Sequence, residues 1–102
     1  MPHKVVFRPE AEADLFGLYR YIAEASGAGR AEAYLARIEG ACMALTTFPE
    51  RGTQRSDLAP GIRTIGFEGR VTIAFRVLDQ EVVEIVAIAY AGRDFEGELR
   101  EG

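Results

Sequence analysis

The clearest pattern along the chain is a change from helical to strand periodicity near its middle. In the first half, apolar residues recur at i, i+3, i+4 and i+7, which is the spacing of one helix face: Leu15, Leu18, Tyr19 and Ile22. Pro9 is suited to the first turn of a helix, and Ser26-Gly27 interrupts the pattern. The spacing predicts a first helix from Pro9 to about Ser26.

A second apolar stripe at helical spacing follows this break: Ala31, Tyr34, Leu35, Ile38, Ala41, Cys42 and Leu45. This helix is expected to begin near Gly29-Arg30. Pro49 is expected to end it, because the residue before a proline disfavours the helical conformation. Two helices of about four turns each, joined by a few small residues, are expected to lie antiparallel as a helical hairpin.

The second half of the chain has the alternation of β-strands. Three strands are predicted, at residues 62–67, 70–78 and 81–90. In the middle strand, one face carries only apolar residues: Val71, Ile73, Phe75 and Val77. In the last strand, Val83, Ile85, Ala87 and Ala89 are expected to oppose Val82, Val86, Ile88 and Tyr90. A strand that is apolar on both faces is typical of a central, doubly covered position.

The remaining segments complete an order of β-α-α-β-β-β. Residues 3–8 alternate as a short strand, and residues 49–61 form a polar connection with a turn at Pro60-Gly61. This order predicts an α+β fold with an N-terminal helical hairpin packed on a small, mostly antiparallel sheet. The first strand is expected at an edge or paired with a later strand. Residues 94–102 are interpreted as a short acidic helix or a frayed end. We expect one domain, residues 1–102.

Composition and charge narrow the classes of function. Apolar residues make up 48% and charged residues 27% of the chain, which is typical of a folded domain. Twelve basic against sixteen acidic residues give a net charge of −4, so no direct binding to nucleic acid is expected. No apolar run reaches the roughly 20 residues of a membrane span, and no signal peptide is seen. We expect a cytoplasmic protein without a membrane partner.

The cysteine content argues against disulfide and metal chemistry. The single cysteine, Cys42, lies on an apolar stripe and is interpreted as a small buried hydrophobic residue. One cysteine cannot form an internal disulfide, and no Cys/His cluster has the spacing of a zinc site. We therefore expect neither a metal nor a cofactor.

Four stretches between about residues 5 and 95 carry a family resemblance. They are residues 7–15, residues 19–24, the motifs Pro49-Glu50-Arg51-Gly52 and Pro60-Gly61-Ile62-Arg63, and the last two strands with the closing Arg93-Asp94. In their order and spacing, these stretches resemble the ParE-type toxins of the ParE/RelE toxin–antitoxin superfamily.

The resemblance implies a fold and a function. The fold is the superfamily's helical hairpin on a curved antiparallel sheet. The function is that of the toxin component of a type II toxin–antitoxin system, neutralised in a hetero-oligomer with a ParD-like antitoxin. Family members are associated with inhibition of DNA gyrase. We therefore expect a protein without enzymatic activity that binds a cellular target, with gyrase as the first candidate.

Two alternatives stay open. RelE-like relatives cut messenger RNA on the ribosome, and such an enzyme would here use Arg63, Arg76, Tyr90 and Arg93. RNA cleavage needs a base, an acid and cations, yet the only histidine is His3. Tyr90 stands where many relatives have a histidine, and a phenol with a pKa near 10 is a poor base. The other alternative is an inactive toxin-derived module that only forms a regulatory complex.

Five residues are predicted to bind a partner. Arg63, Arg76 and Arg93 suit charge-assisted pairs with antitoxin carboxylates, although each is also interpretable as a solvated residue on a strand. Phe16 lies one residue off the apolar stripe of the first helix, and Tyr90 follows the apolar core of the last strand. These two aromatic residues belong either to a partner surface or to the edge of the core.

Apolar surface in excess of what one hairpin can cover predicts an interface. The hairpin covers one face of the sheet, so the other face, or a groove beside the hairpin, is expected to be left apolar. Residues 51–78 hold five arginines and two acids (+3), and residues 79–102 hold two arginines and seven acids (−5). This balance favours an acidic peptide over RNA, docked as a helix or as a strand added to the sheet.

Overall fold

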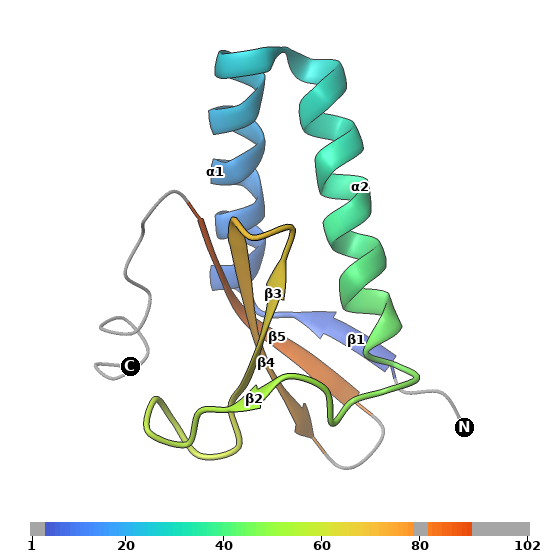
Figure 1. Cartoon of the computed structure of the whole chain (residues 1–102), viewed down its shortest axis with the longest axis vertical. Helices are drawn as coiled ribbons and strands as arrows, with labels where there is room; N and C mark the ends of the chain where they lie inside the picture. The colour runs from blue at the N-terminus through green and yellow to red at the C-terminus, as the bar shows by residue number, and fades with distance from the viewer. Residues whose placement is uncertain (1–3, 79–81, 91–102) are drawn as a thin grey trace.

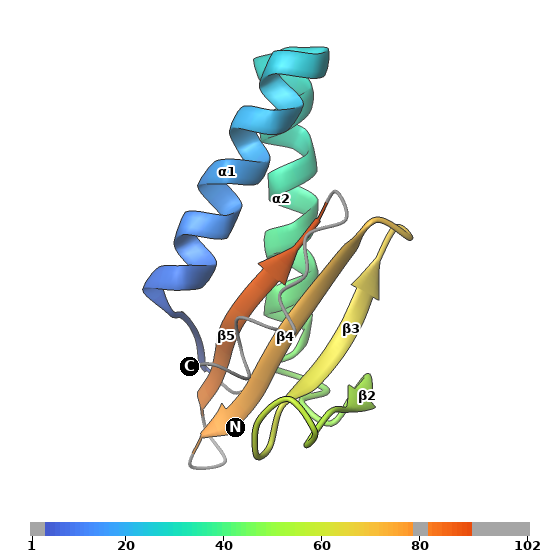
Figure 2. The same cartoon turned by 90° about the vertical axis from the view of Figure 1, so that its left-hand side faces the viewer.

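The computed structural model describes residues 4–78 and 82–90 and has the predicted α+β architecture (Figure 1). The elements are β1 (Lys4–Phe7), α1 (Pro9–Ser26), α2 (Ala28–Ala44), β2 (Thr53–Gln54), β3 (Arg63–Phe67), β4 (Val71–Leu78) and β5 (Val82–Ala89). The two helices lie side by side as a hairpin against one face of a mostly antiparallel sheet (Figures 1 and 2). The predicted tail at residues 94–102 and the gap at Asp79-Gln80 lie outside the described residues.

The strands follow the order β1-β5-β4-β3-β2. Figure 2 shows β5, β4, β3 and β2 side by side in this order. β1 lies at one edge, as expected, and pairs in parallel with β5, so that Phe7 lies opposite Ile85. β2 forms the other edge and was not predicted, because residues 49–61 are polar and β2 has only two residues. Gly52 precedes it with φ +83°, and a Cβ there would collide with the Thr64 carbonyl oxygen. Only a glycine at this point lets the chain approach β3 so closely.

The helices begin and end close to the predicted positions, with one correction. α1 runs from Pro9 and is separated from α2 by Gly27, at φ +98°. α2 ends at Ala44 rather than at Pro49. The Thr46 hydroxyl donates to the Met43 carbonyl at 2.7 Å, and the Thr46 N–H bonds the same carbonyl. These contacts close a turn before the proline is reached. Neither helix is long and apolar enough to cross a membrane within the described residues.

A β-bulge in β5 changes which residues face the helices. The β4–β5 register pairs Ala74 with Ala87 and then Phe75 with Ile85, so Val86 is an extra residue. Val83 and Ile85 pack in the core beneath the helices, and after the bulge Ile88 and Tyr90 join them. The prediction of strict alternation through β5 was therefore wrong after Ile85, because one inserted residue reverses the phase of a strand.

A buried carboxylate on α1 lies beside this bulge. Asp14 is only 4% exposed, and its Oδ2 accepts a hydrogen bond of 2.9 Å from the Ile88 N–H. The contact joins the first third of α1 to the second half of β5. A charge-assisted bond of this kind satisfies a buried backbone donor and fixes the helix relative to the strand.

The far face of the sheet is covered, contrary to the expectation of an open apolar surface there. Its side chains are small and form a second buried cluster with two residues of the β2–β3 connection: Leu58, Ile62, Ala74, Val86, Ala87 and Ala89. The turn at Pro60-Gly61 forms as predicted, with Gly61 at φ +78° and the Ile62 N–H bonded to the Ala59 carbonyl at 3.2 Å. This turn returns the connection to β3, where Leu58 and Ile62 meet the alanines.

Replacing Asp14 by alanine is expected to destabilise the fold by about 1–3 kcal/mol, because the Ile88 N–H would stay buried without its acceptor. Asp14→Asn keeps an acceptor oxygen and should cost less. Urea unfolding of the refolded chain measures both, with Glu39→Ala on the exposed face of α2 as the control. Equal stabilities for Asp14→Ala and Glu39→Ala would contradict the role given to this carboxylate.

Cys42 is expected to be inert in the folded protein. It is fully buried, and burial, helped by the nearby Glu39 carboxylate, raises the pKa of its thiol to about 12. Little thiolate exists at mildly alkaline pH, and the thiolate is the reactive form. Iodoacetamide should therefore label the unfolded chain in urea and leave the native chain unlabelled. Comparable labelling of both would show that Cys42 is accessible.

Candidate functional site

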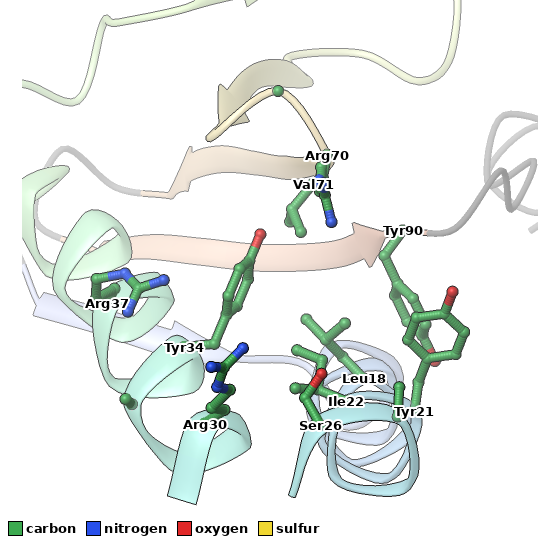
Figure 3. A pocket seen from close by; sticks show the side chains of 13 residues that line it. Leu18, Tyr21, Ile22, Ser26, Arg30, Tyr34, Arg37, Arg70, Val71 and Tyr90 are labelled. Carbon is green, nitrogen blue, oxygen red and sulfur yellow. The ribbon is translucent and has the colours of Figure 1, made fainter.

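A groove of about 790 Å³ lies between the helical hairpin and the β3–β4 turn (Figure 3). The hairpin extends beyond the end of the sheet (Figure 1). The inner faces of its last turns therefore have no strand beneath them. The groove's exposed or partly exposed aliphatic lining is Ile22 and Ala25 of α1 and Ala33 of α2, and the buried Leu18 and Val71 border it. The expectation of a groove beside the hairpin is thus confirmed, whereas the open sheet face is not present.

Two tyrosines form the α1 side of the groove. Tyr21 is 57% exposed, and its ring lies 6.1 Å from that of Tyr90 at an angle of 54° (Figure 3). Tyr90 reaches this position because the bulge turns it toward the helices. Its hydroxyl lies against Gly17, where the Cβ of any other residue would come within 2.6 Å of the oxygen. Only glycine at this position of α1 leaves room for the observed placement of Tyr90.

The α2 side is built on Tyr34. Its ring meets Phe67 of β3 edge-on at 5.6 Å, and the Arg37 guanidinium lies 5.1 Å from the ring centre. Arg37 also binds the Glu68 carboxylate through two nitrogens, at 2.9 and 3.4 Å. Glu68 adopts φ +51° and, with Gly69, forms the tight turn predicted between β3 and β4. These contacts join α2 to the β3–β4 turn at one end of the groove.

The charges around Tyr34 are predominantly positive. Burial raises the pKa of Tyr34, the Glu68 carboxylate adds to this shift, and Arg70 and Arg37 partly offset it. The phenol is therefore a protonated hydrogen-bond donor at neutral pH and is unsuited to act as a base. Arg30 and Arg70 also line the groove. Neither guanidinium has a hydrogen bond or ion pair to any other part of residues 4–78 and 82–90.

Of the four predicted partner-binding residues that the structure describes, only Tyr90 lines this groove. Phe16 is 63% exposed but lies elsewhere on α1, and Arg93 lies outside the described residues. The Arg63 guanidinium donates to the Glu50 carbonyl at 2.9 Å, in a second groove of about 860 Å³. Arg76 pairs with Glu84 across the β4–β5 ladder at 2.7 Å. The structure thus separates these residues instead of assembling one site.

Sequence reasoning missed most of the residues that line the groove: Tyr21, Arg30, Arg37 and Arg70, with Tyr34 assigned to the core alone. A signal existed in α2, where Arg30, Ala33, Tyr34 and Arg37 follow helical spacing beside the apolar stripe. The contribution of Arg70 depends on how the β3–β4 turn meets α2, which local periodicity does not report.

Comparison with known proteins identifies the family. A family model described as the ParE toxin of the type II toxin–antitoxin system parDE matches residues 5–95. The chain belongs to the ParE toxin family. Toxin ParE3 of Caulobacter vibrioides is 33% identical over 85 residues, which cover 74% of this chain and 85% of the relative. This ParE toxin is therefore a component of a type II toxin–antitoxin system.

Solved structures support the same fold for this ParE toxin. A chain of the chromosomal ParDE system of Pseudomonas aeruginosa aligns with a TM-score of 0.75 at 23% identity, covering 87% of this chain and 96% of that one. A chain of the RelBE2 toxin–antitoxin complex of Mycobacterium tuberculosis aligns with a TM-score of 0.61 at 20% identity, covering 89% and 100%. The helical hairpin on a sheet is thus RelE/ParE-like.

The contact of Gly17 with Tyr90 gives a prediction for this ParE toxin. Gly40→Ala lies in open space on α2 and should stabilise the fold by about 1 kcal/mol, the helix-propensity gain of alanine. Gly17→Ala should gain less or lose stability, because its Cβ displaces the Tyr90 hydroxyl. Adding Tyr90→Phe should recover part of the difference in urea unfolding. Equal gains at Gly17 and Gly40 would contradict the close approach.

Proposed function

We propose that this ParE toxin acts by binding a cellular target, with DNA gyrase as the first candidate, and breaks no bond itself. A ParD-like antitoxin neutralises it by laying an amphipathic segment in the groove between the hairpin and the β3–β4 turn. The observation that carries the proposal is the groove itself. The partly exposed Ile22 lines it together with the exposed Tyr21 and Ala25, and the buried Leu18 and Val71 of the core also border it.

The anatomy of the groove supports a peptide as its occupant. Apolar residues are flanked by exposed aromatic rings, chiefly Tyr21, and by the arginines of α2 and the β3–β4 turn. Tyrosine and arginine are enriched at protein–protein contacts, since each combines a large apolar body with a polar end. An amphipathic helix laid into such a groove buries its apolar side and leaves its polar side in water.

The placement of the nuclease candidates supports binding over cleavage. Arg63 and Phe75 are opposite each other in the β3–β4 register, so their side chains share the helix-side face of the sheet. Arg76, the next residue along β4, projects from the other face and is held by Glu84. Tyr90 lies against α1 at Gly17. These three groups do not converge on one phosphate, as a cleavage site requires.

Expression of the toxin in bacterial cells tests the proposal. Without antitoxin we expect growth arrest with filamentation and a DNA-damage response, while messenger RNA stays intact. Co-expression of the antitoxin encoded beside the toxin gene should restore growth, and the two proteins should purify together. If the purified toxin inhibits DNA supercoiling catalysed by purified gyrase, gyrase is the target. The toxin–antitoxin complex is the inactive control.

The alternatives give different results in the same experiment. Rapid arrest of translation with cut transcripts would favour a RelE-like endonuclease and overturn the proposal. Unimpaired growth at high expression, with an antitoxin complex still formed, would favour an inactive module that only forms a regulatory complex. Growth arrest while gyrase stays fully active would show that the toxin binds a target other than gyrase.

A further inference from the structure

Two arginines whose side chains have no hydrogen bond or ion pair among the described residues point to the chemistry of the occupant. Arg30 belongs to the first turn of α2, which contains no acidic residue, and Arg70 belongs to the β3–β4 turn. Figure 3 shows both side chains beside Tyr34, approaching the groove from different elements. The effect of Arg70 on the Tyr34 phenol places it within electrostatic reach of that hydroxyl. Two uncompensated guanidinium groups thus border one aromatic side chain.

The position of Arg30 is unfavourable for the helix that carries it. The N-terminal end of a helix has a partial positive charge, so a cation in the first turn lowers helix stability. Within the described residues, no carboxylate offsets Arg30. Arg37, on the same side of the groove, already binds a carboxylate: two of its nitrogens bond Glu68 at 2.9 and 3.4 Å. A partner carboxylate at Arg30 or Arg70 would repeat that contact.

We propose that the groove selects an acidic amphipathic segment of the antitoxin, with an apolar ridge and carboxylates along the edge that faces α2 and the β3–β4 turn. The ridge lies on Ile22, Ala25 and Ala33, and the carboxylates pair with Arg30 and Arg70. This inference rests on the proposed function, because it names the chemistry of the segment that the same groove accepts. Arginine's planar fork matches a carboxylate in two hydrogen bonds.

The charge distribution favours such a peptide over a nucleic acid. A phosphate backbone is bound through many cations, and affinity rises with the number of phosphates neutralised. The groove offers two uncompensated arginines around an apolar centre, in a protein with a net charge of −4. An acidic helix matches both its apolar and its positive parts.

Binding of the co-purifying antitoxin to the refolded toxin tests the inference. Arg30→Gln and Arg70→Gln are each expected to weaken the Kd by about tenfold, the low end for a lost charge-assisted hydrogen bond. The control is Arg20→Gln, which removes the same charge from an exposed position of α1 outside the groove. Its Kd should stay within about twofold of wild type. Circular dichroism and urea unfolding confirm that every variant folds.

The salt dependence of the Kd separates ion pairs from general packing. The wild-type Kd should weaken as NaCl is raised from about 0.1 M to about 1 M, and the Arg30→Gln/Arg70→Gln double variant should lose most of this dependence. If the Arg30→Gln and Arg70→Gln variants have the same Kd and the same salt dependence as Arg20→Gln, the inference is overturned, while antitoxin binding itself is not. A single-stranded RNA oligonucleotide bound through Arg30 and Arg70 would also overturn it. Failure of the wild-type toxin to bind any antitoxin would instead refute the proposed function.

Discussion

The hydrogen bond from the Ile88 N–H to the buried Asp14 carboxylate is the contact on which the groove depends. It joins α1 to β5 just after the bulge at Val86. The bulge turns Tyr90 toward the helices, where Gly17 leaves room for its hydroxyl and Tyr21 meets its ring. One inserted residue in a strand, held by one carboxylate on a helix, therefore sets the α1 side of the groove.

The second determinant is the mismatch in length between hairpin and sheet. The helices continue past the ends of the strands, so no strand lies beneath the turns next to the connection between the two helices (Figure 1). No residue in the described ranges 4–78 and 82–90 fills this space. The arrangement instead leaves Ile22 and its neighbours partly exposed, which is the usual state of an interface before its partner binds.

Much of the fold was predictable because its signals are local. Apolar spacing located both helices and the three long strands, and Gly27, Gly61 and Gly69 all mark turns in which they adopt positive φ. The bulge was not predictable, since Val86 has the same strand-forming chemistry as its neighbours and only the register with β4 shows that it is inserted. The groove was harder to predict from the sequence, because Arg70 and Tyr34 come together only through tertiary packing. Periodicity describes which face a residue occupies within its own element and not which elements meet.

The central claim is that an antitoxin segment completes the core in the groove between the hairpin and the β3–β4 turn. Hydrogen exchange of the toxin, free and bound to its antitoxin, tests this most directly. Binding should slow exchange in residues 18–37 and 67–71, which border the groove, and leave residues 47–51 of the second groove nearly unchanged. Protection confined to residues 47–51 and 61–63, with residues 18–37 unaffected, would contradict the account.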